Sequence, residues 1–261
     1  MDRKKVIEDF GKLLDIMDRL RAECPWDREQ TLDTLRTLTI EETYELSDAI
    51  LENDLHEISK ELGDLLLHIV FYAKIGEEKG AFDMDYVINR LCEKLIYRHP
   101  HVFGTIEADN SAEVIRNWEQ LKIKEKDGNK SVLSGVPSGL PALVKAYRVQ
   151  DKVRALGFDW EAREQVWDKV TEELGEFKAE WEKADADRME AEFGDVLFAL
   201  VNAARLYGIN PETALERTNR RFIDRFEYLE EKTIKQGRSL KDMTLGQMEE
   251  IWQEAKCRDK E

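Results

Sequence analysis

The sequence predicts an all-α protein built from two tandem helical repeats. Apolar residues recur with helical spacing along most of the chain, and no segment shows a convincing strand-like alternation. Glycine and proline are scarce, at 14 and 5 of the 261 residues, so few positions interrupt a helix. An acidic motif also occurs twice with unchanged spacing, which indicates a duplicated structural unit.

The first half is expected to begin with an amphipathic helix whose apolar stripe is Val6, Phe10, Leu13, Leu14, Met17 and Leu20. Pro25 interrupts it, and the favoured interpretation of Pro25-Trp26-Asp27 is a loop that packs its aromatic side chain on the core. Two helices with acidic residues follow. Asp83 is the expected N-cap of a helix that runs to Leu95, and Ser111 opens another.

The second half is also expected to be helical. One helix runs from near Ala142 to near Gly157, and Asn210-Pro211 starts another, because proline suits the first helical position. We expect that helix to end at Gly237 and the last helix to open at Thr244. Residues 126–131 read as the best linker, and Gly135, Pro137, Gly139 and Pro141 extend this irregular stretch. We therefore predict an N-terminal helical domain at 1–128, a linker at 129–141 and a C-terminal helical domain at 142–261.

Four carboxylates form two pairs around Ala184. Glu173 and Glu176 are three residues apart and share a helix face, as do Glu192 and Asp195. The pairs lie at equal distances on either side of Ala184, so an antiparallel hairpin turning there would bring them together. Four carboxylates cannot all stay ionised at close range without a cation, and oxygen ligands select Mg²⁺ or a similar ion.

The alternative for this motif is a solvated, charged helix face. Two observations weigh against it. Residues 196–201, directly after Asp195, are apolar on every helical face, which predicts a helix buried all round. The whole pattern also recurs 131 residues earlier, with Asn53 at the position of the hinge and with the carboxylates Glu42, Glu45, Glu61 and Asp64.

These residues resemble the MazG family of nucleoside triphosphate pyrophosphohydrolases. The resemblance includes Cys24-Pro25-Trp26-Asp27, the doubled acidic motif, residues 98–103 (Arg-His-Pro-His-Val-Phe) and Leu140-Pro141-Ala142-Leu143, in family order along essentially the whole chain. It implies two tandem MazG-like helical bundles, completed by dimerisation. It also implies Mg²⁺ dependence and cleavage of nucleoside triphosphates to nucleoside monophosphate and pyrophosphate.

Basic residues accompany the acidic motif. Arg221 and Arg225 are four apart on one helix face, and guanidinium groups suit phosphate oxygens. Lys169 and Arg188 each lie four residues before a carboxylate. The family's ligand positions map onto these four residues and Trp252. The alternative for the basic residues is a surface salt bridge; for Trp252, core packing competes with stacking on a purine.

Composition narrows the partners and the compartment. The net charge of −16 argues against binding nucleic acid or an anionic membrane, but leaves room for a small anionic substrate beside a metal. Cys24, Cys92 and Cys257 show no paired spacing, which suits a reducing compartment. Residues 1–21 do not read as a signal peptide, and no apolar run is long enough to span a membrane, so the expected location is cytoplasmic.

The favoured function is Mg²⁺-assisted hydrolysis of nucleoside triphosphates, ATP included, between the α- and β-phosphates. Glu172, next to the metal ligands, is the candidate to orient the attacking water. A homodimer is expected, because the helices after Asp64 and Asp195 are too apolar for one short neighbour to cover. The alternatives are a hydrolase specific for dUTP or a modified nucleotide, and a non-catalytic helical scaffold.

The C-terminal half is expected to carry most of the activity. The positions that match Lys169 and Arg188 in the first half are Leu38 and Glu57, so two cations are replaced by an apolar and an acidic residue. Lysine also stands at position 94, where the second half has Arg225.

Overall fold

The computed structural model describes residues 1–105, 110, 113–114, 117–118, 121–122, 131–160 and 162–258. Within these ranges the chain forms helices and turns and contains no strand, so the all-α prediction is confirmed. The chain divides into two compact units, Met1–Glu107 and Ala108–Glu261. Most of the predicted linker segment 126–131 lies outside the described residues, as do Ser111 and Ala112, and the predicted domain limits stay predictions.

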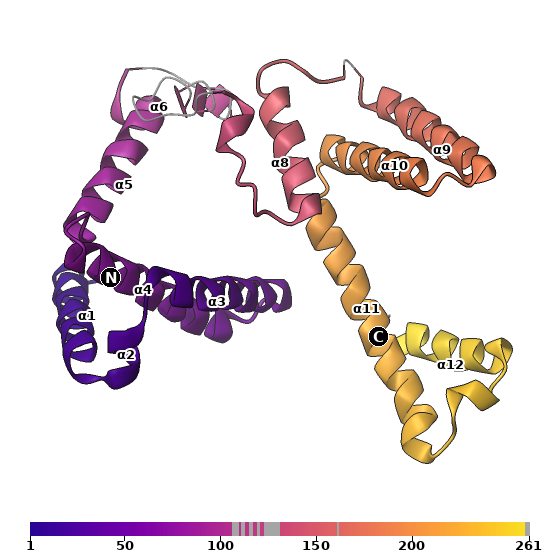
Figure 1. Cartoon of the computed structure of the whole chain (residues 1–261), viewed down its shortest axis with the longest axis horizontal. Coiled ribbons are helices and arrows are strands. Elements are labelled where there is room, and N and C mark those ends of the chain that lie inside the picture. Colours follow the sequence, from indigo (N-terminus) through magenta and orange to yellow (C-terminus); the bar gives the residue numbers. More distant parts are fainter. Residues whose placement is uncertain are drawn as a thin grey trace. The chain divides into compact units, whose positions relative to one another are not determined.

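The first unit is organised around an antiparallel pair of long helices (Figure 1). Its helices are α1 (Arg3–Glu23), α2 (Pro25–Glu29), α3 (Leu32–Glu52), α4 (Leu55–Glu78), α5 (Met84–Arg98) and α6 (Pro100–Phe103). Met17, Leu35, Val70, Phe71 and Ile75 form the buried core, and Phe10, Leu13 and Leu14 of the predicted stripe pack against it. Asp83 caps α5 as predicted, by accepting a hydrogen bond from the backbone N–H of Tyr86.

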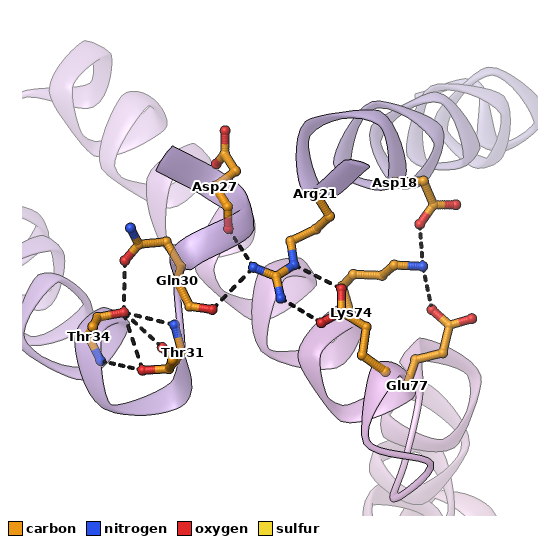
Figure 2. A network of polar contacts seen from close by, with 9 residues as sticks. Asp18, Arg21, Asp27, Gln30, Thr31, Thr34, Lys74 and Glu77 are labelled. Carbon is orange, nitrogen blue, oxygen red and sulfur yellow. Dashed lines mark hydrogen bonds and ion pairs between the residues drawn. The ribbon is translucent and has the colours of Figure 1, made fainter. Parts of the chain in front are cut away.

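The prediction of a loop at Pro25-Trp26-Asp27 was wrong. These residues begin the short helix α2, with proline at its first position, and Trp26 is 55% exposed instead of covering the core. The side chain of Arg21 binds the backbone of this segment. Its guanidinium donates to the carbonyl oxygens of Asp27 and Gln30, as Figure 2 shows. The same guanidinium pairs with Glu78 on α4, with 2.5 Å between Nη2 and Oε2. Arg21 of α1 therefore links the backbone of the α2 segment to the side chain of Glu78 on α4.

The second unit repeats the hairpin and adds a second helical pair (Figure 1). Its elements are η1 (Leu133–Gly135), α8 (Ala142–Arg154), η2 (Arg163–Gln165), α9 (Val166–Lys183), α10 (Ala186–Leu206), α11 (Pro211–Lys232), η3 (Ile234–Gln236), η4 (Leu240–Asp242) and α12 (Leu245–Arg258). Asn210 caps α11, as its position before Pro211 predicts. However, α11 ends at Lys232, and Gly237 closes η3.

The two hairpins turn in the same way. Asn53 and Ala184 both adopt the left-handed conformation, with φ of 57° and 56°, and no other non-glycine residue with a positive φ occurs in the described part of the chain. Asp54 and Asp185 follow them and cap α4 and α10 with their side chains. The prediction that the chain turns at these hinges, 131 residues apart, is confirmed.

Within one chain the apolar helices after the acidic motifs are covered on one face only, so burial on every face, which we expected together with a homodimer, stays a prediction. On α10, Val196, Ala199 and Val201 are buried, but Phe193 is 49% exposed and Leu200 41%. The covered face meets α8 and α9, and the other face carries large apolar side chains on the surface. In the described ranges, none of the helices combines the length and the apolar character needed to cross a bilayer.

Candidate active site

Three carboxylates meet between α9 and α10. Oxygens of Glu173, Glu176 and Glu192 all lie within 4.8 Å of one another. Glu173 is buried, whereas Glu176 is exposed. Burial, together with the negative charges of Glu176 and Asp195, raises the pKa of Glu192. Such a set of hard oxygen donors, strained by mutual repulsion, fits a divalent cation such as Mg²⁺.

Asp195, the fourth predicted ligand, lies one helical turn after Glu192. It borders a cavity of about 540 Å³ together with Glu173 and Lys169. Two of the carboxylates therefore border a half-open cavity, and the four positions that the sequence paired about Ala184 belong to one region of the unit.

Lys169 is the cation at this set. Its Nζ lies 2.8 Å from Oε1 of Glu172 and 2.7 Å from Oε1 of Glu173. Hydrogen bonds to Glu172 and Glu173 raise the pKa of Lys169, so the ammonium stays charged. The ion pair confirms that Lys169 and Glu173, four residues apart, share one face of the helix.

The other basic candidates lie elsewhere. Arg188 pairs with Asp185 at 3.6 Å and with Glu180 at 4.0 Å, close to the hinge, and its side chain is largely exposed. Arg221 donates to Oγ1 of Thr218 on its own helix. In this structure both arginines therefore contact side chains close to them in the sequence, and these contacts do not include the carboxylate set.

Arg225 and Trp252 belong to the pair formed by α11 and α12. Arg225 borders a smaller cavity there, with Tyr228 and Ala255. The ring of Trp252 packs on that of Phe222, with 5.0 Å between centroids, which favours the packing interpretation of this tryptophan. In the structure Lys169 contacts the carboxylates, whereas Arg221, Arg225 and Trp252 lie on the pair of helices α11 and α12.

The first unit contains the matching carboxylate set. Oxygens of Glu42, Glu45 and Glu61 lie within 4.8 Å of one another. Burial and the charges of Glu45, Asp64 and Glu61 raise the pKa of Glu42. The repeat in sequence is therefore a repeat in side-chain geometry.

A lysine that matching the two halves by position did not reveal forms ion pairs at this first carboxylate set. Lys60 Nζ lies 3.0 Å from Glu57 and 3.2 Å from Glu61, although the matching residue of the second half is Ala191. The first half does lack the counterparts of Lys169 and Arg188, but it holds a cation supplied by α4 instead of α3. Checking the residues beside each carboxylate, and not only matched positions, would have found it.

The cavity beside Glu173 and Asp195 also contains residues that the sequence analysis did not single out. It lies between α8, α10 and the turn at residues 157–160. Arg205 of α10 is buried and forms a two-point ion pair with Asp159 of this turn. The Nη2–Oδ1 distance is 2.5 Å and the Nη1–Oδ2 distance is 3.0 Å. Burial opposes the charge on Asp159, but the hydrogen bonds from Arg205 lower its pKa overall. In the sequence, the position of Arg205 within an apolar helix was the signal that could have indicated a buried ion pair.

Comparison with known proteins identifies the family of this chain. A sequence model of the MazG nucleotide pyrophosphohydrolase domain matches residues 30–103 and 162–229, which contain the two carboxylate hairpins. The chain belongs to the MazG family. The matched model describes a nucleotide pyrophosphohydrolase domain, so this chain is a hydrolase that acts on phosphoric anhydride bonds, and the predicted family and enzyme class are confirmed.

Individual relatives resemble this MazG chain along nearly its full length. The nucleoside triphosphate pyrophosphohydrolase of Escherichia coli (strain K12) is 43% identical over 257 residues, covering 96% of this chain and 98% of the relative. The nucleoside triphosphate pyrophosphohydrolase/pyrophosphatase MazG of Thermotoga maritima is 43% identical over 253 residues, covering 96% of both chains. The similarity therefore includes both repeats.

Proposed function

We propose that this chain is a Mg²⁺-dependent nucleoside triphosphate pyrophosphohydrolase. It hydrolyses ribo- and deoxyribonucleoside triphosphates, ATP among them, at the bond between the α- and β-phosphates, and releases nucleoside monophosphate and pyrophosphate. The observation that carries the proposal is the convergence of Glu173, Glu176 and Glu192 beside Lys169. The printed names of the full-length relatives support the same substrate class.

In the proposed reaction Glu173, Glu176, Glu192 and Asp195 hold the metal. When bound, Mg²⁺ polarises a phosphoryl oxygen and lowers the pKa of a coordinated water. A water oxygen would bond to one phosphorus of the α–β linkage while that phosphorus loses its bond to the bridging oxygen. Nucleoside monophosphate and pyrophosphate would leave, and the proton given up by the water would pass to solvent.

Glu172 is proposed to orient the attacking water. Its carboxylate stands next to the ligand Glu173 and is fixed by Lys169 at 2.8 Å. Lys169 keeps its proton and offers positive charge at the edge of the cavity. No nucleophilic side chain is required, because water is the nucleophile.

A homodimer is proposed to complete the site. The exposed apolar side chains of α10, such as Phe193 and Leu200, would be removed from water by a second copy. Arg221, Arg225, Arg188 and Trp252 remain the proposed substrate-binding residues, and we expect the arginines to meet phosphate oxygens in the assembled dimer.

Product analysis tests this function. The protein is incubated with Mg²⁺ and a panel of ribo- and deoxyribonucleoside triphosphates, and the products are separated. Pyrophosphate with nucleoside monophosphate is the expected result. Orthophosphate would indicate cleavage of a different bond, activity on dUTP alone would indicate the narrow-specificity alternative, and no turnover would favour a scaffold.

A further inference from the structure

The acidic face of α9 continues beyond the predicted metal ligands. Glu180 follows Glu176 by four residues, so the two side chains share one face of the helix. The side chain of Glu180 is only 12% exposed, although it lies close to the hairpin turn. Burial is the main reason that the pKa of Glu192 is raised, and Glu180 is among the carboxylates whose charges raise it further. Glu180 therefore faces the space between α9 and α10.

Glu180 and Arg188 occupy matching places on the two sides of the hinge. Each is four residues from Ala184, just as Glu176 and Glu192 are each eight residues from it. The two residues therefore form the next level of the hairpin, between the carboxylates and the turn. Nη1 of Arg188 lies 4.0 Å from Oε1 of Glu180, which is an ion pair without a hydrogen bond.

One oxygen of Glu180 is left for a further donor. Oε1 already accepts from Nζ of Lys183 at 2.7 Å. Oε2 is buried and, in the described part of the chain, has no hydrogen-bond partner. A buried carboxylate oxygen without a donor is costly, so the arrangement favours another donor at this place. Arg188 is the neighbouring candidate, because its side chain is largely exposed and can turn toward Glu180.

The guanidinium of Arg188 keeps one nitrogen for a substrate. Its Nε lies 3.6 Å from Oδ2 of Asp185 and its Nη1 faces Glu180, whereas Nη2 takes part in neither ion pair. A guanidinium that two carboxylates hold through two of its nitrogens has a fixed orientation, and its third nitrogen can donate to a phosphate oxygen.

The first repeat lacks this level of the hairpin. The residues that match Glu180 and Arg188 are Ala49 and Glu57, and Ala49 is buried. Alanine therefore suits this position of the hairpin. A carboxylate at the same position adds repulsion between acidic groups, so stability does not explain it. Its presence in the second repeat indicates a role in the chemistry of that repeat.

We infer that Glu180 positions Arg188 for the phosphates of the substrate. When a triphosphate is bound, Arg188 donates to Oε2 of Glu180 through one nitrogen and to a phosphate oxygen through another. Glu180 is thus a positioning residue that acts through Arg188, and it does not ligate the metal. The inference rests on the proposed function for the contact of Arg188 with the substrate.

Binding of α,β-methylene-ATP, an analogue that the proposed reaction cannot cleave, tests this role by calorimetry with Mg²⁺ and the full-length protein. Glu180→Ala and Arg188→Ala should each raise its Kd by about tenfold. The double variant should also raise it by about tenfold, because the two residues act as one unit. Glu180→Gln keeps an acceptor oxygen without the charge, and should raise the Kd by only about threefold.

The direction of the change separates positioning from simple charge. Loss of a carboxylate near a site for an anion would otherwise strengthen binding of the analogue. Glu182→Ala removes the same charge from the exposed surface of α9, and this matched control should leave the Kd within about twofold. Unchanged or tighter binding in Glu180→Ala would overturn the inference, as would a double variant whose effect is the product of the two single effects.

Two further outcomes are also decisive. If Glu180→Ala needs more Mg²⁺ before it binds the analogue, Glu180 is a metal ligand and the inference is wrong. Failure of the wild type to bind the analogue would overturn it as well. If the wild type binds the analogue but releases no pyrophosphate from ATP, the proposed function fails, while the Kd values still decide the role of Glu180.

Discussion

Asn53 and Ala184 hold the same left-handed backbone conformation at the turns of the two hairpins. Asparagine tolerates this conformation, whereas alanine pays a steric cost of about 1 kcal/mol or more. We therefore expect Ala184→Gly to raise the free energy of unfolding by about 0.5–1 kcal/mol and Asn53→Ala to lower it by a similar amount. Urea unfolding curves of the two variants check this pair. A lower midpoint for Ala184→Gly would contradict the steric account of the hinge.

The Arg205–Asp159 ion pair predicts an acid-sensitive element of the second unit. Because the folded-state pKa of Asp159 is lowered, its stabilisation is present above the unfolded pKa of about 4 and is lost as pH falls through the lower folded value. Asp159→Asn should remove this pH dependence and lower stability near pH 7 by about 2–3 kcal/mol, since Arg205 stays buried without its charged partner. Thermal unfolding from pH 2.5 to 7 measures it. Parallel profiles for wild type and variant would refute it.

The arginines of α11 are expected to act on the substrate phosphates. Arg221→Ala and Arg225→Ala should each reduce transition-state stabilisation by about 2 kcal/mol or more, as for other preorganised charge donors. Lys169→Ala should cost less, although it also frees Glu172 and Glu173 from their ion pairs. Values of kcat/KM for ATP decide this. Wild-type values in both arginine variants would show that the phosphate-binding face lies elsewhere.

The metal assignment predicts that single ligand losses abolish turnover. Glu173→Ala or Asp195→Ala should stop pyrophosphate release while the helix content stays nearly unchanged, because oxygen ligands hold the cation. EDTA should stop the wild-type reaction, and Mg²⁺ should restore it. Circular dichroism is the control for folding. Near-normal activity of either variant at low Mg²⁺ would remove these residues from the metal site.

Much of the fold was predictable because spacing constrains helices strongly. The hinges followed from the equal distances of the carboxylates from Ala184, and the starts of α5 and α11 followed from Asp83 and Asn210. The ion pair of Lys169 with Glu173 followed from a separation of four residues. These are local relationships, which the period of a helix determines without knowledge of tertiary packing.

Features that depend on packing between helices were missed. The contact of Arg205 with Asp159 joins residues 46 apart in the sequence, and the cavity beside Asp195 is lined by residues of both α8 and α10. The loop expected at Trp26 failed for a similar reason, since Arg21 binds the backbone of this segment from another helix. The placement of Arg221 and Trp252 was likewise set by the packing of α11 on α12.

We propose that the C-terminal carboxylate set carries most of the hydrolysis and that the N-terminal set, despite its matching geometry, contributes little. Glu45→Ala and Glu176→Ala are a matched pair, since each removes an exposed glutamate from one set of three. Pyrophosphate release from ATP in the presence of Mg²⁺ is measured for both. We predict that Glu176→Ala loses most of the activity and that Glu45→Ala retains most of it. Loss in Glu45→Ala with retention in Glu176→Ala would contradict the account, and equal partial losses would mean that both sets hydrolyse the substrate.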